Sequence, residues 1–169
     1  MTPGKFRFEA LNDGHDRVPF HCGDAALDRY FQTQVTQDLR RRMANCFVLL
    51  EVASARIAAF YTLSAASIAL ADLPPADSKR LPRYPAVPVV RIGRLAVDQG
   101  FQRRGLGELM LMNAVSRTLQ DADAAFALLV DAKNDQAVAF YRRYGFRPIA
   151  ERPMTLFLPL ATAQKALLA

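Results

Sequence analysis

The fold is decided by the stretch from Val89 to Gly107, which runs VVRIGRLAVDQGFQRRGLG. Its first half is apolar and β-branched, which predicts a buried strand. Gly93 inside that strand indicates a bulge or a close approach of another part of the backbone. Asp98-Gln99-Gly100 is a turn signal, and an amphipathic pattern starts at Gly105. We therefore expect a strand, a glycine-containing loop and a helix in direct succession.

A glycine loop between a strand and a helix is suited to binding an anion. The first amides of a helix have no acceptor within it and carry partial positive charge. Gly105 and Gly107 have no Cβ, so a bulky anion such as a diphosphate can approach the backbone closely. Gln102, Arg103 and Arg104 add hydrogen-bond donors and positive charge beside the loop. The alternative is a tight turn before an ordinary helix.

The spacing separates this loop from two other nucleotide-binding loops, because it has neither Gly-x-Gly-x-x-Gly nor Gly-Lys-Ser/Thr. It resembles the acetyl-CoA signature of the GNAT acyltransferase superfamily, Gln/Arg-x-x-Gly-x-Gly/Ala after a strand that ends Leu-x-Val. Here the strand ends Leu95-Ala96-Val97, and the signature is Gln102-Arg103-Arg104-Gly105-Leu106-Gly107. The resemblance implies that the strand backbone binds the pantetheine arm and that the loop amides hold the diphosphate.

A second motif follows one strand later. The segment from Asn134 to Phe146 runs NDQAVAFYRRYGF and resembles the second GNAT signature, Asn-x-x-Ala-x-x-Phe/Leu-Tyr-x-x-x-Gly-Phe. The resemblance implies that Asn134 binds the cofactor and that Tyr141, which fits the family position where Tyr144 does not, stands near the thioester sulfur. The alternatives are a helix cap for Asn134 and an aromatic core residue for Tyr141.

The implied chemistry is direct transfer of an acetyl group from acetyl-CoA to an amine. A backbone amide of the first strand, for which Val97 is the candidate, polarises the thioester oxygen. A free thiol has a pKa of about 8.5 and tyrosine one of about 10, so Tyr141 can protonate the thiolate late in the step. Neither His15 nor His21 lies near these motifs, so no general base is identified. Cys22 is not expected to be a nucleophile, because no covalent intermediate is needed.

The rest of the chain supplies the other elements of an α/β (α+β) fold. We expect strands at 6–11, 46–52, 57–63, 126–131, 146–149 and 154–160, and helices after Asp24, over 105–121, over 136–144 and over 161–169. Strand, crossover helix and strand form a right-handed unit with two parallel strands. The resemblance implies a GNAT fold in one domain, 1–169, with a mixed sheet of about six or seven strands, a splayed parallel pair and about four helices.

Periodicity and end signals define the helices in more detail. Asp24 is a candidate N-cap, and the helix after it has an apolar stripe, formed by Leu27, Phe31, Val35 and Leu39. The helix after the glycine loop is expected to bury Leu106, Leu109, Met110, Met112, Val115 and Leu119. Gly145 is expected as the C′ residue of the last motif helix. The proline-rich stretch 72–88 shows no regular pattern and is expected to be a long connection.

Composition excludes several classes of protein. The chain has 169 residues, 51% of them hydrophobic and 22% charged, which is globular rather than disordered. It contains no apolar run long enough to span a membrane and no signal-peptide pattern. Cys22 and Cys46 are too few for a disulfide scaffold and suggest reduced thiols, so we expect a cytoplasmic protein. With the two histidines they lack metal-ligand spacing. No metal site is therefore expected.

The charge is strongly basic. The net charge is +6 and the pI about 9.7, and only four of the 22 basic residues are lysines. Arginine matches phosphate geometry well, so this surface favours nucleic acid or an anionic cofactor such as CoA; a genome rich in arginine codons is the other explanation. The candidates for phosphate contact are Arg40, Arg41, Arg42, Arg80 and Arg83. Solvated charge, and favourable placement at a helix end for the first three, are the alternatives.

A closer resemblance covers nearly the whole chain. The segments involved are similar to the GNAT toxins of bacterial toxin–antitoxin pairs: Phe20-x-Cys22-Gly23-x-x-x-Leu27-Asp28-x-Tyr30-Phe31, Tyr61-Thr62-Leu63-Ser64, Tyr84-Pro85-x-x-Pro88, Arg94-Leu95-Ala96-Val97-Asp98 and Val130-Asp131-Ala132-Lys133. The resemblance implies acetylation of the α-amino group of aminoacyl-tRNA, which blocks translation. It also implies a ribbon-helix-helix antitoxin as partner and a homodimer.

The chemistry of the acceptor agrees with this hypothesis. An α-amino group has a pKa near 7.7–8, so much of it is already neutral at cytoplasmic pH and the missing base matters less. Two alternatives stay open at this point. One is a GNAT enzyme that acts on a small-molecule amine or a protein N-terminus. The other is an inactive acetyl-CoA-binding module, against which the intact Tyr141 and glycine loop argue.

Overall fold

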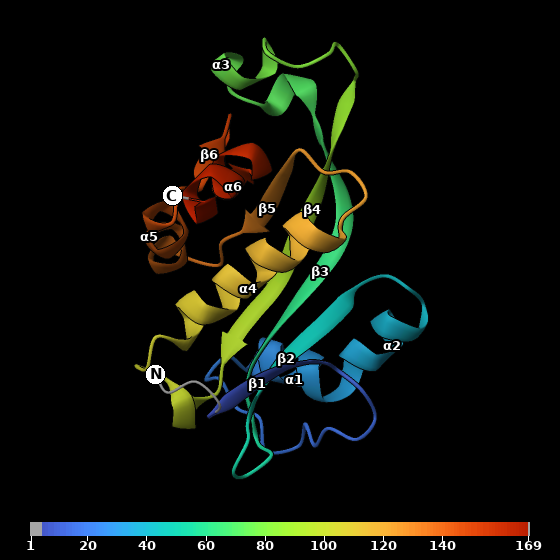
Figure 1. The fold of residues 1–169 in the computed structure, drawn as a ribbon, viewed down its shortest axis with the longest axis vertical. Helices are drawn as coiled ribbons and strands as arrows, with labels where there is room; N and C mark the ends of the chain where they lie inside the picture. The colour runs from blue at the N-terminus through green and yellow to red at the C-terminus, as the bar shows by residue number, and fades with distance from the viewer. Residues whose placement is uncertain (1–4, 169) are drawn as a thin grey trace. The chain divides into compact units, whose positions relative to one another are not determined.

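A computed structural model of the chain describes residues 5–168 and contains a mixed seven-stranded sheet (Figure 1). The strand order is β1-β2-β3-β4-β5-β7-β6. The strands are β1 (Phe6–Ala10), β2 (Asn45–Glu51), β3 (Ile57–Ala69), β4 (Ala86–Val97), β5 (Ala127–Asp131), β6 (Arg147–Ile149) and β7 (Arg152–Pro159). Strands β4 and β5 are parallel. The expected mixed α/β sheet with one parallel pair is therefore confirmed.

The helices are more numerous than expected, because several are short. They are α1 (Ala25–Arg29), α2 (Val35–Arg40), α3 (Pro75–Ser78), α4 (Leu106–Asp121), α5 (Asp135–Arg143) and α6 (Leu160–Leu168), with a π-helical turn η1 (Tyr30–Gln34) and 3-10 turns η2 (Leu70–Asp72) and η3 (Gln99–Phe101). Within residues 5–168, none of them is both long and apolar enough to cross a membrane.

The chain divides into two compact units, and strands β3 and β4 and helix α4 contribute to both. The first unit comprises residues 1–64 and 93–114, and the second comprises 65–92 and 115–169. In the first unit β1 pairs antiparallel with β2, and β2 pairs antiparallel with β3. Its core has an aromatic centre in which the rings of Phe31 and Phe60 stack at 4.2 Å and the ring of Phe20 packs edgewise on both.

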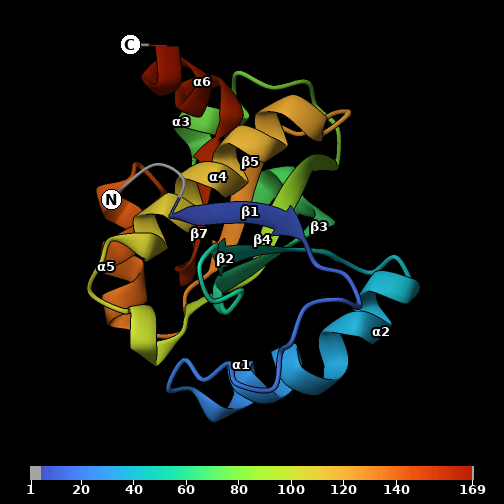
Figure 2. The same ribbon diagram turned by 60° about the horizontal axis from the view of Figure 1, so that its bottom comes forward.

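The helix expected after Asp24 is correctly capped but is not continuous. Asp24 Oδ1 accepts hydrogen bonds from the amides of Ala26 and Leu27, as the N-cap prediction requires. The π-helical turn η1 then separates α1 from α2, and α2 contacts β2 (Figure 2). Phe31 and Val35 are fully buried, whereas Leu27 and Leu39 are only half-buried. The apolar stripe did not reveal this turn, because its members keep helical spacing across it.

The second unit contains the parallel pairing. Its register runs from Val89↔Ala127 to Ile92↔Val130, while β4 itself continues to Val97. Strand β5 is fully buried up to its last residue and pairs antiparallel with β7 on its other side, as expected for an interior strand. Helix α6 contacts β5 and β7, and α5 contacts β7; all four elements are labelled in Figure 2.

Three further expectations about the fold were wrong. Strand β3 continues to Ala69 instead of ending at Leu63, because the run of buried residues ends at Leu63 and Ile68 is the only large apolar residue after it. The stretch 72–88 contains the regular helix α3 and the start of β4. Pro75 lies in the first turn of α3, where its missing N–H leaves no acceptor unpaired. Met112 is 37% exposed, and Leu111 is fully buried instead. Met112 lies about 200° around the helix from the buried Met110.

Candidate functional site

The glycine loop of the first unit presents unpaired main-chain amides. The first bond into α4 runs from the amide of Leu109 to the carbonyl of Gly105 at 3.2 Å. Within the described chain, the amides of Leu106, Gly107 and Glu108 have no acceptor, as expected at the start of a helix. Arg103 has φ of 64° and Gly105 φ of 75°, so two left-handed residues turn the chain into the helix.

The space around the two glycines of the decisive stretch differs. A Cβ on Gly105 would meet no atom within 4 Å, so the surroundings of this residue are open. A Cβ on Gly93 would lie 2.9 Å from Thr62 Oγ1, and the same hydroxyl accepts the amide of Arg94 at 3.1 Å. A close approach at Gly93 is therefore confirmed, but it is made by the Thr62 side chain and not by another part of the backbone. It joins β3 to β4 immediately before Leu95–Val97.

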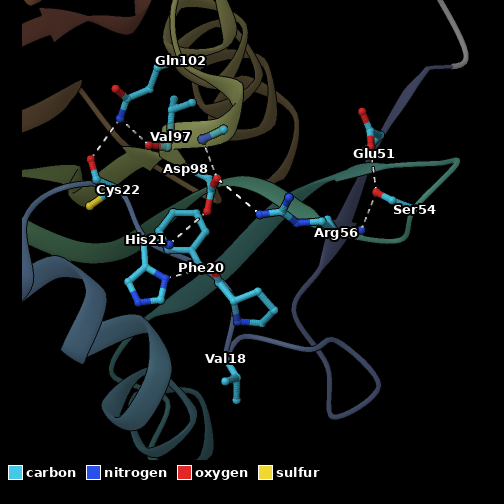
Figure 3. Close-up of polar contacts among 12 residues, drawn as sticks. Val18, Phe20, His21, Cys22, Glu51, Ser54, Arg56, Val97, Asp98 and Gln102 are labelled. Carbon is cyan, nitrogen blue, oxygen red and sulfur yellow. Dashed lines mark hydrogen bonds and ion pairs between the residues drawn. The ribbon is translucent and has the colours of Figure 1, made fainter.

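The side chains of the loop fall into two groups. Gln102 Nε2 donates to the carbonyls of Cys22 and Val97, at 2.9 and 3.0 Å, so both of its N–H groups are occupied (Figure 3). The Arg104 guanidinium lies 5.3 Å from the centre of the Phe101 ring. Arg103 and Arg104 are both exposed. The two arginines can therefore contribute charge to a ligand, while the Gln102 side chain holds the loop to its neighbours.

The structure brings His21 to the glycine loop, although the sequence placed both histidines away from the motifs. The main-chain amide of His21 donates to Asp98 Oδ2 at 2.9 Å (Figure 3). The carbonyl of His21 accepts the amide of Gln99 at 2.8 Å. The His21 imidazole is exposed and bonds locally to the carbonyl of Pro19. The contact is therefore made by the backbone of a segment far away in sequence, which no local pattern announces.

Sequence reasoning also missed a cluster beside the strand end. The Arg94 guanidinium lies 3.6 Å from the centre of the Tyr30 ring, and the Tyr30 hydroxyl donates to Asp38 Oδ2 at 2.6 Å. Burial, and then the neighbouring Asp38, raise the pKa of Tyr30. Tyr30 is the first residue of η1, and π-helical turns are frequent at functional sites. The apolar periodicity does not reveal this turn, and the only sequence signal for the cluster is that Tyr30 and Arg94 both stand in segments that resemble the GNAT toxins.

Helix α5 of the second unit carries the other predicted residues. Asn134 is its N-cap, since Asn134 Oδ1 accepts the amide of Ala137 at 2.8 Å. Gly145 closes it with φ of 94°, and the amides of Gly145 and Phe146 donate to the carbonyls of Arg142 and Tyr141. This is the Schellman arrangement, so the expected C′ glycine is confirmed.

Tyr141 is a buried phenol on α5. It is 7% exposed, and its ring packs edgewise on Phe140 at 5.1 Å and on Phe146 at 5.4 Å. Burial raises the pKa of Tyr141 to about 12. Within residues 5–168 no hydrogen-bond partner of its hydroxyl is found. The hydroxyl therefore stays protonated at neutral pH and is available as a donor.

The five candidate arginines are exposed and lie in different units. Arg40, Arg41 and Arg42 end helix α2 in the first unit, where positive charge also suits the helix dipole. Arg80 and Arg83 follow α3 in the second unit.

The two cysteines lie in the part of the chain that the structure describes and give no sign there of a metal site or a disulfide. Both cysteines are free thiols, and burial raises the pKa of Cys22 to about 11. Among the described residues, no cluster of three or more metal-binding side chains is found.

Three features together are those of the class of acetyl-CoA-dependent acyltransferases. The sheet is mixed and contains a parallel pair, a glycine loop opens a helix after the first of these two strands, and a capped helix follows the second. The family model of the acetyltransferase (GNAT) domain matches residues 21–155. This match covers most of the chain, which therefore belongs to the GNAT acetyltransferase family.

Relatives and solved structures agree with this assignment. A tRNA-acetylating toxin of Mycobacterium tuberculosis is 34% identical over 156 residues, which are 91% of this chain and 92% of the relative. AtaT complexed with acetyl-methionyl-tRNAfMet has a TM-score of 0.85 at 28% identity, over 96% of this chain and 99% of that chain. A mutant AtaT toxin bound to the C-terminus of the antitoxin AtaR and to acetyl-CoA has a TM-score of 0.75 at 26% identity, over 97% and 98% of the two chains.

Proposed function

We propose that this protein transfers the acetyl group of acetyl-CoA to the α-amino group of aminoacyl-tRNA and is the toxin of a toxin–antitoxin pair that inhibits translation. The observation that carries the proposal is the similarity to a tRNA-acetylating toxin over 91% of this chain. If the two proteins shared only a cofactor-binding loop, they would be similar only over a short stretch. Similarity over nearly the whole length extends to the regions that choose the acceptor.

The residues of the glycine loop fit the diphosphate of acetyl-CoA. Three unpaired amides start α4, Gly105 is open to a close approach, and Arg103 and Arg104 add positive charge. In this proposal the amides of Gln102–Gly107 bind the diphosphate, and the backbone of Leu95, Ala96 and Val97 binds the pantetheine arm. Asn134 keeps its amide N–H groups for the cofactor, because its Oδ1 already caps α5.

Tyr141 is proposed as the general acid. Acetyl-CoA, when bound, supplies the acetyl group as an activated thioester. The neutral amine nitrogen forms the new C–N bond and gives up one of its protons to solvent. The C–S bond breaks, and the thiolate takes the proton of the Tyr141 hydroxyl, which solvent then restores. The raised pKa, about 12, keeps the hydroxyl protonated until that moment. An α-amino acceptor with a pKa near 7.7–8 loses its proton to solvent without a dedicated base.

The partners follow from the same proposal. The exposed Arg40, Arg41, Arg42, Arg80 and Arg83 are the candidates for contact with tRNA phosphates. The AtaT complex with the C-terminus of AtaR supports an antitoxin as the protein partner. We further propose that the antitoxin has a ribbon-helix-helix part, that the enzyme is a homodimer in one-domain subunits, and that it acts in the cytoplasm, where its substrate is found.

The test is acetyl transfer from labelled acetyl-CoA to a set of competing acceptors. Charged tRNA, uncharged tRNA, polyamines and peptides are incubated with the enzyme, with Tyr141→Phe as the inactive control. Label is expected on charged tRNA. It should be released when the aminoacyl ester is hydrolysed. Label found on polyamines or peptides and never on tRNA would identify an ordinary GNAT enzyme instead. A wild-type protein that neither binds acetyl-CoA nor transfers its acetyl group would contradict the acetyltransferase activity itself.

A further inference from the structure

Asp98 is a buried carboxylate at the junction between β4 and the glycine loop, and the proposed chemistry does not use it. It is only 3% exposed. Its Oδ1 accepts the amide of Gly100 at 2.8 Å, and its Oδ2 accepts the amide of His21 at 2.9 Å (Figure 3). The guanidinium of Arg56 lies 3.6 Å from Oδ1. Both oxygens are therefore bound by groups of the protein itself, which gives this buried carboxylate a structural role in the cluster.

A second set of bonds joins the same two segments. The amide of Gln99 donates to the carbonyl of His21, and Gln102 Nε2 donates to the carbonyl of Cys22. The segment 21–22 and the turn 98–102 are thus tied by bonds in both directions, which we call the loop clasp. A Cβ on Gly23 would lie 3.0 Å from Gln99 Nε2, so the two segments are also packed closely.

The loop behind the clasp needs external support. Arg103 adopts φ of 64°, a left-handed conformation that is unfavourable for a residue with a side chain. Gly105 follows with φ of 75°. Such conformations persist only where the surroundings hold them. The clasp ends at Gln102, immediately before these residues, so it fixes the point from which the chain turns toward the unpaired amides of α4.

We propose that Asp98 is a positioning residue for acetyl-CoA: through the loop clasp it holds the amides of the glycine loop in the geometry that the diphosphate requires. This inference rests on the proposed function. It predicts an effect that depends on the diphosphate. Binding of the thioester arm and the proton transfer by Tyr141 do not depend on Asp98, whereas recognition of the diphosphate does.

The decisive variant is Asp98→Asn. Asparagine has one acceptor oxygen and one NH₂ group, so it cannot accept from both Gly100 and His21. The main-chain amide of one of these two residues then faces the NH₂ group, which is a second donor. Loss of a hydrogen bond to a charged group lowers affinity by about tenfold or more. We expect the Kd and KM for acetyl-CoA to rise by that factor, with kcat and the KM for the acceptor changed less than about twofold.

Two further measurements separate positioning from general damage. The first compares acetyl-CoA with S-acetylpantetheine, which lacks the diphosphate. Asp98→Asn should lower kcat/KM for acetyl-CoA and leave kcat/KM for S-acetylpantetheine unchanged. The second is hydrogen exchange in the ligand-free protein, in which the amides of His21 and Gly100 should exchange faster in the variant. Asp13→Asn, the same change of charge at an exposed loop position, is the control and should alter none of these quantities.

The outcomes decide the proposal. An equal loss of activity toward both thioesters, or wild-type affinity for acetyl-CoA in Asp98→Asn, would overturn it while leaving the acetyltransferase function intact. Failure of the wild-type protein itself to bind acetyl-CoA would overturn the proposed function as well. If Asp98→Asn does not fold, Gln102→Met breaks the other half of the clasp without disturbing a buried charge. It must then show the same selective loss toward acetyl-CoA, and if it does not, the proposal is wrong.

Discussion

The glycine loop and helix α5 are proposed to serve one reaction by opposite means. The loop offers main-chain amides around an exposed, open glycine, Gly105. Helix α5 offers one side chain, that of Tyr141, which is 7% exposed. An amide can bind only a ligand that reaches it, so the loop must be open. A phenol that is to stay protonated benefits from burial, because burial disfavours its anion. Backbone changes should therefore damage the loop most, and side-chain changes should damage α5 most.

The largest effect is expected from Tyr141→Phe, which removes the hydroxyl and keeps the ring. Turnover should fall by about a hundredfold or more, while the affinity for acetyl-CoA changes little, because a general acid acts only in the chemical step. Single-turnover acetyl transfer and calorimetric binding measure the two quantities. Tyr144→Phe is the matched control, since Tyr144 packs on Phe140 from the same helix end and should keep full turnover. An unchanged rate in Tyr141→Phe would remove the proposed role.

The burial of the phenol can be tested by its alkaline titration. The pKa of Tyr141 is raised from 10 in the unfolded chain to about 12 in the folded protein. Its contribution to stability is therefore fully present below pH 10 and is lost as the pH rises through about 12. The loss should be about 3 kcal/mol, because each pKa unit corresponds to about 1.4 kcal/mol. Urea unfolding of the wild type and of Tyr141→Phe over this range measures it. Parallel pH profiles of the two proteins would show that Tyr141 is not buried as described.

A pair of glycine substitutions sharpens the comparison between the two regions. Gly105 and Gly145 both have positive φ, 75° and 94°, and at neither would a Cβ meet an atom closer than 3.4 Å. Alanine therefore causes similar backbone strain at the two positions, of roughly 1–2 kcal/mol. We expect Gly105→Ala to weaken acetyl-CoA binding about tenfold. Gly145→Ala should lower the unfolding midpoint and leave binding unchanged. Equal binding losses in both variants would show that the loop effect is only global destabilisation.

The smallest effects are expected from the arginines. Replacing Arg40, Arg41 and Arg42 together by alanine should raise the KM for charged tRNA several-fold and reduce the dependence of this KM on salt. The reason is that tRNA binding releases fewer counterions when phosphate contacts are lost. The KM for acetyl-CoA should not change. Arg80→Ala with Arg83→Ala tests the second unit in the same way. Arg147→Ala, at an exposed arginine that pairs with Asp77, is the control. If the KM for charged tRNA depends on salt as strongly in these variants as in the wild type, the arginines carry only solvated charge and do not contact tRNA phosphates.

Local rules predicted the parts of the site that depend on neighbours in sequence. Asp24 caps α1 and Gly145 closes α5, because a cap needs only the amides and carbonyls of its own turn. The same rules failed at Met112 and in the interruption of the helix by η1, where packing against other segments decides. The cluster of Arg94 with Tyr30 was also missed, since its members come from a strand and a helical turn far apart in the chain.

The sequence by itself determined the class of enzyme and the direct succession of strand, glycine loop and helix, since both depend on residue types at fixed short spacings. Only the tertiary structure decided that Asp98 meets the amide of His21, 77 residues earlier in the chain, and that the Tyr141 ring is buried between Phe140 and Phe146. The physical reason is that burial and long-range hydrogen bonds depend on which segments the completed sheet brings together. These contacts set the pKa of the phenol and the support of the loop.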